Sequence, residues 1–309
     1  MNTLAEHAQQ YLALRRGLGH ELADAARLLP RFVAHLDRAG AKTITTATAL
    51  DWVQQPAADP ISSVWMRRMT AVRGFARYMA GTDARTEIPP LGVVTFRQRR
   101  RSPFLYSAAD VEALMAAAVR AIPTPLRAAT VQTMIGLLAA TGMRIGEAIR
   151  LERSDVDWTD GALTVKASKF NKSRLLPLEP TAVAALANYA RTRDRLQPRP
   201  GAPTFFLSAK GTRVIYADFG EVFRSLVADS GVGAGSAARP RIHDLRHSFA
   251  VHTLVRWYRA GADVGALLPR LSTYLGHRDP RSTYWYLSAA PELLSLAAAR
   301  LEAGGEQRP

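Results

Sequence analysis

The chain has 309 residues, no cysteine and a formal net charge of +15. This length suits two domains rather than one, and the lack of cysteine excludes disulfides, thiolate nucleophiles and Cys-ligated zinc. Lys and Arg outnumber Asp and Glu by 41 to 26, which favours a polyanionic partner because each neutralised phosphate releases condensed counterions. Ribosome-associated and membrane-surface proteins are also basic, and a GC-rich genome enriches arginine, so charge alone leaves the partner open.

The chain also lacks the marks of a membrane or secreted protein. It has no run of about 18 apolar residues, so no membrane span is predicted. Its N-terminus has no basic segment followed by an apolar one, which is the pattern of a secretion signal. We therefore expect a cytoplasmic protein with no membrane partner.

The first 96 residues have the apolar spacing of α-helices. Four stretches show this spacing: residues 4–18, 22–36, 46–53 and 64–79. Gly40, Pro56 and Gly81 mark helix ends, and Thr46 is expected to cap the third helix. The sequence therefore predicts a helical N-terminal domain over residues 1–96.

Arginines gather on the fourth predicted helix, on the side away from its apolar residues: Arg67, Arg68, Arg73 and Arg77. A solvated charged face is the ordinary interpretation of such a run. Here all the charges have one sign, which favours contact with a DNA backbone.

A basic segment that contains proline follows this domain. Residues 97–103 read Arg-Gln-Arg-Arg-Arg-Ser-Pro and predict an inter-domain linker. Its arginines are candidates for DNA contact: Arg97, Arg99, Arg100 and Arg101. A basic linker can follow a phosphate backbone, and a purely flexible tether fits this composition nearly as well.

A second unit is expected over residues 104–309, where Ser107 is expected to cap a helix that begins at Ala108. Further helices are predicted over residues 126–140, over 144–151 and from Pro180 onward. Between them the apolar period changes to two over residues 163–178, which predicts a β-hairpin with its turn at 169–172. Two loops are predicted from composition, at residues 192–204 and 229–240. The predicted fold class is mainly α with a small β-hairpin or sheet.

Four short pieces of this unit carry groups suited to phosphate chemistry. The first is Thr-Gly-Met-Arg-Ile-Gly-Glu at residues 141–147. Arginine binds phosphate through two parallel hydrogen bonds and stays charged, so Arg144 is a candidate phosphate-binding group. Glu147 lies one helical turn further on, where it can hold Arg144 in place. Taken alone, Arg144 is as readily explained as a surface residue after a helix stop.

The second piece is His-Asp-Leu-Arg-His at residues 243–247. His243 and Arg246 are three residues apart and share one helix face, and His247 stands beside Arg246 to brace the site. Histidine transfers protons near neutral pH. Capping or core histidines are the alternative interpretation of this piece.

The third piece is Leu-Gly-His at residues 275–277, in which the glycine is expected to end a helix. The fourth holds two phenols, Tyr284 and Tyr286, and aromatic residues in such a stretch usually belong to a core. A lysine, Lys169, begins the hairpin turn, where lysines are normally just exposed.

In their order and spacing these pieces resemble the tyrosine recombinases, the phage integrase family, over residues 104–290. The family's nucleophile lies nine residues after the histidine of the Leu-Gly-His piece, which selects Tyr286. Residues 169–178 are similar to the family's turn lysine and its Asn-Lys-x-Arg-x-x-Pro-Leu sequence, although Ser168 and Phe170 stand where the family often has glycine. The N-terminal helices are similar to its SAM-like core-binding domain in helical content and position. The resemblance therefore implies an integrase-type α+β catalytic domain after a helical core-binding domain.

The resemblance also implies a mechanism that needs no metal and no cofactor. Tyr286 attacks the scissile phosphate and forms a 3′-phosphotyrosyl bond, with release of a 5′-hydroxyl. The other implied roles are phosphate binding by Arg144 and Arg246, protonation of the leaving oxygen by Lys169, handling of the tyrosine proton by His243, and a hydrogen bond from His277 to a phosphate oxygen.

Members of the family work as tetramers on two DNA sites, so the resemblance implies double-stranded DNA with a specific recombination site as the partner. They also exchange a C-terminal segment between neighbouring subunits. Residues 290–303 form a predicted amphipathic helix that suits this exchange. A helix docked on its own subunit is the alternative.

Two other functions are weighed against recombination. A type IB topoisomerase shares the chemistry but relaxes DNA as a monomer, and a catalytically idle DNA-binding protein would keep the charge without the reaction. A metal-dependent nuclease is not expected, because no carboxylate cluster stands near the basic motifs. The glycines at 231, 233 and 235 do not form a nucleotide-binding loop, because their spacing does not fit G-x-G-x-x-G and no Walker Gly-Lys-Ser/Thr motif occurs. Phage integration, transposon movement, a resolvase role and chromosome dimer resolution are all compatible with the sequence.

Overall fold

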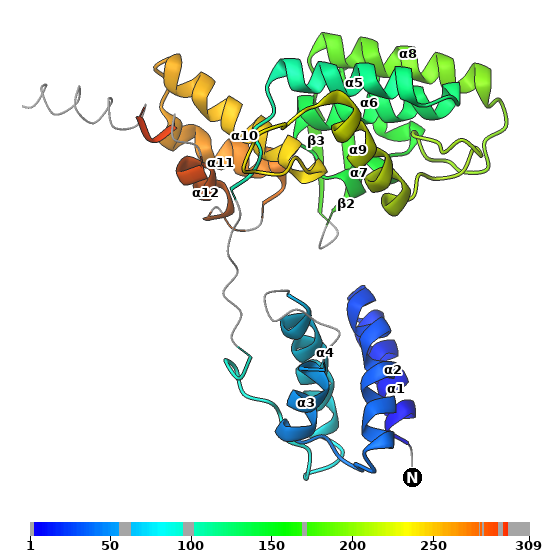
Figure 1. Cartoon of the computed structure of the whole chain (residues 1–309), viewed down its shortest axis with the longest axis vertical. Coiled ribbons are helices and arrows are strands. Elements are labelled where there is room, and N and C mark those ends of the chain that lie inside the picture. The colour runs from blue at the N-terminus through cyan, green and yellow to red at the C-terminus, as the bar shows by residue number, and fades with distance from the viewer. Residues whose placement is uncertain are drawn as a thin grey trace, which may run out of the picture. The chain divides into compact units, whose positions relative to one another are not determined.

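The computed structural model describes residues 3–55, 63–94, 102–168, 172–277, 279, 281–289 and 293–295. The chain divides into two compact units, Met1–Arg100 and Arg101–Pro309 (Figure 1). No helix within the described ranges combines the length and apolarity that a bilayer crossing demands. Lys169, the arginines at 97–101 and all of the predicted C-terminal helix except residues 293–295 lie outside these ranges.

The described part of the N-terminal unit is helical, as its apolar spacing predicts. Its helices are α1 (Leu4–Gly17), α2 (Ala23–Arg38), α3 (Thr46–Val53) and α4 (Val64–Met79). Phe32 and Phe75 are fully buried in its core. One prediction is wrong: Thr45, not Thr46, caps α3, because it is the Thr45 side chain that accepts a hydrogen bond from an N–H of the first turn.

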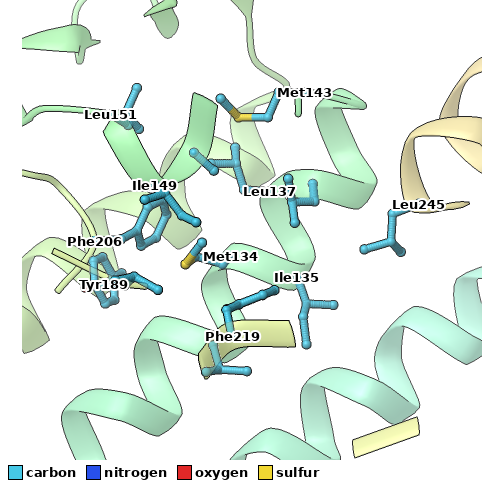
Figure 2. Packing of buried hydrophobic residues seen from close by; sticks show 14 of the residues in the cluster. Met134, Ile135, Leu137, Met143, Ile149, Leu151, Tyr189, Phe206, Phe219 and Leu245 are labelled. Carbon is cyan, nitrogen blue, oxygen red and sulfur yellow. The ribbon is translucent and has the colours of Figure 1, made fainter. Parts of the chain in front are cut away.

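The C-terminal unit is built around helix α6. Its helices are α5 (Ala108–Ala121), α6 (Pro125–Thr141), α7 (Ile145–Arg150), α8 (Pro180–Leu196), α9 (Tyr216–Ser230), α10 (Ile242–Arg259), α11 (Val264–Leu275) and α12 (Arg281–Ala289). Figure 2 shows Met134, Ile135 and Leu137 of α6 among the buried residues, with Tyr189 of α8 and Phe219 of α9 in the same cluster. Since α6 lies inside this cluster, its C-terminal end is held firmly, and the candidate site begins there.

A small antiparallel sheet accompanies these helices. It consists of β1 (Val156–Asp157), β2 (Ala162–Ser168) and β3 (Lys172–Pro177), in the order β1-β2-β3, and a 3-10 turn, η1 (Arg153–Asp155), precedes it. The β2–β3 hairpin was predicted, and its register pairs Leu163 with Leu176 and Val165 with Arg174. The two-residue strand β1 was not predicted, because two residues are too few to show an alternating pattern.

Two further boundaries differ from the prediction. Residues 192–196 belong to α8 rather than to a loop, because Arg193 is buried and its Nη2 donates to the carbonyl of Thr204 at 3.1 Å. Helix α9 was not predicted, and it extends into the predicted loop at 229–240 as far as Ser230 before Gly231 ends it.

Candidate active site

The site begins at Gly142, which ends helix α6 in a left-handed conformation with φ of 60°. A Cβ atom there would lie 2.6 Å from Cδ1 of Phe249 on α10. Glycine therefore lets α10 approach closely, and the Gly142 carbonyl accepts a hydrogen bond of 2.8 Å from Nη1 of Arg246.

Arg144 follows at the N-cap of α7. Its Nη1 donates to Oε1 of Glu147 at 3.0 Å, as the sequence predicted, and its Nη2 donates to the carbonyl of Gly276 at 3.0 Å. The side chain is still 36% exposed. The guanidinium is thus fixed from two sides and open to a ligand on another.

Glu147 is buried and holds more than Arg144. Its Oε1 and Oε2 accept hydrogen bonds from Nη1 and Nη2 of Arg174 on β3, at 3.1 and 2.8 Å. Burial alone would raise the pKa of this carboxyl, but Arg174 and then Arg144 outweigh it and lower the pKa to about 2. Glu147 is therefore an anion throughout the neutral range.

Arg246 on α10 is the buried arginine of the site. Besides its bond to Gly142, its Nη2 donates to the carbonyl of Leu275 at 2.7 Å. Burial, with a further contribution from the charge of Arg144, lowers its pKa to about 10. The guanidinium consequently stays charged at neutral pH. Because it is buried, its attraction for a negative charge is weakened less by the solvent than that of an exposed arginine.

Gly276 ends α11 in a left-handed conformation, as predicted, and His277 follows it. Nδ1 of His277 is hydrogen-bonded to Oγ1 of the buried Thr283 at 2.7 Å, which fixes the ring. Burial and then Arg246 and Arg144 lower the pKa of His277 to about 4. Its imidazole is therefore neutral near pH 7.

The two candidate phenols separate clearly. Tyr286 is 2% exposed and Tyr284 is 54% exposed. The Tyr286 ring centroid lies 5.4 Å from that of His247 and 6.0 Å from that of His277. Burial raises the pKa of the Tyr286 hydroxyl, and the Arg246 guanidinium beside it works in the opposite direction. Only Tyr286 thus lies among the predicted site residues.

Two histidines of α10, His243 and His247, complete the cluster. The ring centroids of His243 and His247 are 4.7 Å apart. His243 is exposed, yet the surrounding protein and the charge of Arg246 lower its pKa. Burial, followed by His243, lowers the pKa of His247 to about 3. Both rings are therefore neutral near pH 7.

The four arginines of α4 that were predicted to contact DNA make contacts within the N-terminal unit or are exposed. Nη1 of Arg68 donates to two carbonyls at the end of α3, and its guanidinium lies 5.3 Å from the ring centroid of Trp52. Arg73 donates to the carbonyls of Pro89 and Pro90. Arg67 and Arg77 are exposed. Arg67 also pairs with Asp24 at 3.7 Å, so three of these four arginines make contacts within their own unit.

Sequence reasoning missed Arg174 and Thr283, which hold Glu147 and His277 in place. Arg174 belongs to the Arg-x-x-Pro-Leu stretch that carries the family resemblance, but nothing local distinguishes it from an exposed strand arginine.

Among the residues that the structure describes, no group of three or more His, Cys, Asp or Glu side chains is arranged to hold a metal ion.

The Phage integrase family model matches residues 105–292, more than half of the chain. The chain belongs to this family. It is therefore a tyrosine recombinase, an integrase-type enzyme that acts on DNA.

Individual relatives agree with the family match. The protein y4rB of Sinorhizobium fredii, which is named as an integrase/recombinase, is 42% identical over 100% of both chains. Tyrosine recombinase XerD of Caulobacter vibrioides is 31% identical over 90% of this chain and 86% of its own. The solved structure of XerH bound to its palindromic difH substrate after cleavage has a TM-score of 0.66 at 19% identity, and covers 90% of this chain and 79% of that one. The last likeness is one of fold.

Proposed function

We propose that Tyr286 is the nucleophile of DNA strand cleavage and that the chain joins DNA ends through it. The Tyr286 oxygen forms a bond to the scissile phosphorus as the bond from phosphorus to the 5′ oxygen breaks. The products are a 3′-phosphotyrosyl linkage and a 5′-hydroxyl, and attack by another 5′-hydroxyl reverses the step without added energy. The observation that carries this proposal is the position of the Tyr286 ring beside His247 and His277, with Arg246 next to it.

Arg144 and Arg246 would bind the two non-bridging phosphate oxygens. A phosphodiester gains a second negative charge as the tyrosine oxygen adds, and fixed guanidiniums stabilise that charge without rearrangement. The two arginines come from different helices, and both donate to carbonyls at the end of α11, those of Gly276 and Leu275. This shared anchor supports their action as a pair on one phosphate.

Proton transfer falls to neutral histidines and to a lysine. Because burial makes the Tyr286 hydroxyl a weaker acid, its proton must be accepted as it attacks. The lowered pKa of His243 keeps its imidazole able to accept the proton, and the neutral His277 ring still has one N–H that can donate to a phosphate oxygen. Lys169, which directly follows β2 in the sequence, would protonate the 5′ oxygen.

The N-terminal unit would hold the duplex. A surface cavity of about 400 Å³ between α2 and α4 is lined by arginines from both helices: Arg27, Arg31, Arg38, Arg67 and Arg68. Each phosphate contact contributes about 0.9 to the slope of log affinity against log salt. Alanine at Arg31, Arg38 and Arg67 together should flatten this slope, whereas Arg85→Ala, which removes an exposed arginine paired with Asp83, should not. An unchanged slope in the triple variant would remove this face from the proposal.

The linker arginines at 97–101 would extend that contact. On this proposal the enzyme acts in the cytoplasm as a tetramer on a specific recombination site, with residues 290–303 reaching a neighbouring subunit. Light scattering of the chain on its duplex, with and without residues 290–309, tests the assembly. Loss of the large species in the truncated chain is expected, and its persistence would exclude this role.

The reaction itself is tested with a nicked suicide duplex, in which the strand fragment that carries the new 5′-hydroxyl diffuses away after cleavage. On a denaturing gel we expect DNA labelled on the 3′-phosphate side to migrate with the protein. Relaxation of supercoils without preference for a DNA site would instead support a topoisomerase. Free DNA ends without any adduct would contradict the proposal.

A further inference from the structure

Arg174 is a buried arginine that the mechanism above does not use. It lies on β3, opposite Val165 of β2, and its side chain is only 10% exposed. Its Nε donates to the carbonyl of Tyr274 at 2.8 Å, and Nη1 and Nη2 donate to Glu147. All three nitrogens are thus bound within the protein, which makes a direct phosphate contact a poor explanation for this residue.

The carboxylate of Glu147 is shared between two arginines. Oε1 accepts from Nη1 of Arg144 and Nη1 of Arg174, and Oε2 accepts from the Arg144 backbone N–H at 2.9 Å and from Nη2 of Arg174. Because each oxygen binds both arginines, the orientation of the carboxylate depends on both. A substitution of Arg174 therefore changes the position of the carboxylate that holds the Arg144 guanidinium.

A second connection runs through the end of α11. Gly276 has φ of 68°, and a Cβ atom there would lie 3.0 Å from Nη1 and 3.1 Å from Cζ of Arg174. The Arg174 guanidinium therefore packs directly against this glycine. The carbonyl of the same residue accepts the hydrogen bond from Nη2 of Arg144. Arg174 thus contacts both of the groups to which the Arg144 side chain is bonded.

We propose that Arg174 is a positioning residue that holds the guanidinium of Arg144 in the phosphate-binding orientation, through Glu147 and Gly276. This inference rests on the proposed role of Arg144 in binding a phosphate oxygen. Arg174 also balances charge, since Glu147 alone would neutralise Arg144. Arg144 and Arg174 both bind the Glu147 carboxylate, so this network keeps one net positive charge, and Arg246, bonded to the Gly142 carbonyl, adds a second for the phosphate.

The test compares two DNA substrates that differ at the scissile phosphate. One is the ordinary phosphodiester, and the other carries a methylphosphonate, in which a methyl group replaces one non-bridging oxygen and removes its charge. Single-turnover cleavage by Arg144→Ala identifies the methylphosphonate diastereomer that depends least on Arg144. Arg174→Ala is then measured on both substrates, relative to the unchanged chain.

We expect Arg174→Ala to slow phosphodiester cleavage by about 10- to 100-fold, the range for partners that orient active-site groups. On the selected methylphosphonate it should come within a few-fold of the unchanged chain, because the oxygen that Arg144 binds is gone. An equal loss on both substrates would assign Arg174 a purely structural role, and no loss on the phosphodiester would also overturn the inference. If the unchanged chain does not cleave the phosphodiester, the proposed function fails instead.

A control and a second variant complete the experiment. Arg153→Ala removes an exposed arginine paired with Asp194 in the same unit and should leave both rates unchanged. If Arg174→Ala does not fold, Glu147→Gln replaces it, because an amide has only one acceptor oxygen for the two arginines. Glu147→Gln should show the same difference between the substrates, and an equal loss on both would again contradict the positioning role.

Discussion

Replacement of Glu147 by alanine should destabilise the C-terminal unit strongly. The carboxylate is buried and bonded to two arginines, Arg144 and Arg174. Removal of one partner from a buried ion pair costs about 3–5 kcal/mol, because it leaves charge unpaired in the protein interior. We expect a loss of this size in the free energy of unfolding at pH 7.

The same carboxyl predicts how this loss changes with pH. Its pKa falls from an ordinary value of 4.5 to about 2 in the folded chain. A lowered pKa stabilises the fold above pH 4.5, and this stabilisation is lost as pH falls through the folded value. At about 1.4 kcal/mol per pKa unit, the contribution is ~3.4 kcal/mol at pH 7 and ~2 kcal/mol at pH 3.5. The gap between the unchanged chain and Glu147→Ala should therefore narrow by ~1.4 kcal/mol between these two values.

Urea titrations at pH 7 and pH 3.5, read by pulsed hydrogen exchange of peptides from α6, isolate the C-terminal unit from the N-terminal one. Glu221→Ala, at an exposed position on α9, is the matched control and should change stability by no more than about 0.5 kcal/mol. A gap between the unchanged chain and Glu147→Ala that does not vary with pH, or a loss no larger than the control's, would refute the account of this ion-pair network.

Three further outcomes follow from the site. Gly142→Ala places a Cβ 2.6 Å from Phe249 at a residue with a left-handed φ, so thermal unfolding should show a loss of about 2–5 kcal/mol in the free energy of unfolding. Gly231→Ala also has a left-handed φ but open space around it, and should lose only about 1–2 kcal/mol. Equal losses in the two variants would contradict this explanation. Formation of the covalent protein–DNA adduct should persist in EDTA, because the arginines stabilise the developing charge on the phosphate. Loss of the adduct in EDTA and its recovery with Mg²⁺ would refute this mechanism. Because the pKa values of His243 and His277 are both lowered from the ordinary 6.5, any fall in the rate of adduct formation on acidification should have its midpoint below pH 6.5, and a midpoint at or above 6.5 would contradict this.

Local structure was readable from the sequence wherever neighbouring residues decide it. The capping box of Ser107 with Asp110 depends only on contacts within one helical turn, and it forms as predicted. The left-handed glycine at 276 and the shared helix face of His243 and Arg246 are of the same kind. The order and spacing of these motifs then sufficed to indicate the family.

What was missed depends on contacts across the fold. Arg174 binds Glu147, 27 residues away, and Tyr274, 100 residues away, and a strand arginine carries no local sign of such partners. Helix α9 is a different case, because Phe219, Phe223 and Leu226 repeat at helical intervals and are buried. Its periodicity was present in the sequence, but only the glycine-rich segment that follows it was interpreted, and that segment predicted a loop.

The identity of the nucleophile is the central claim, and the chain supplies its own control. Tyr286 is buried beside His247 and His277, whereas Tyr284, on the same helix, is exposed. The decisive measurement is mass spectrometry of the peptide that remains linked to a nicked suicide substrate, made on the unchanged chain, Tyr286→Phe and Tyr284→Phe. Both variants keep the ring and should bind DNA. We predict linkage at Tyr286 in the unchanged chain and in Tyr284→Phe, and no adduct with Tyr286→Phe. Linkage at Tyr284, or an adduct formed by Tyr286→Phe, would contradict the account.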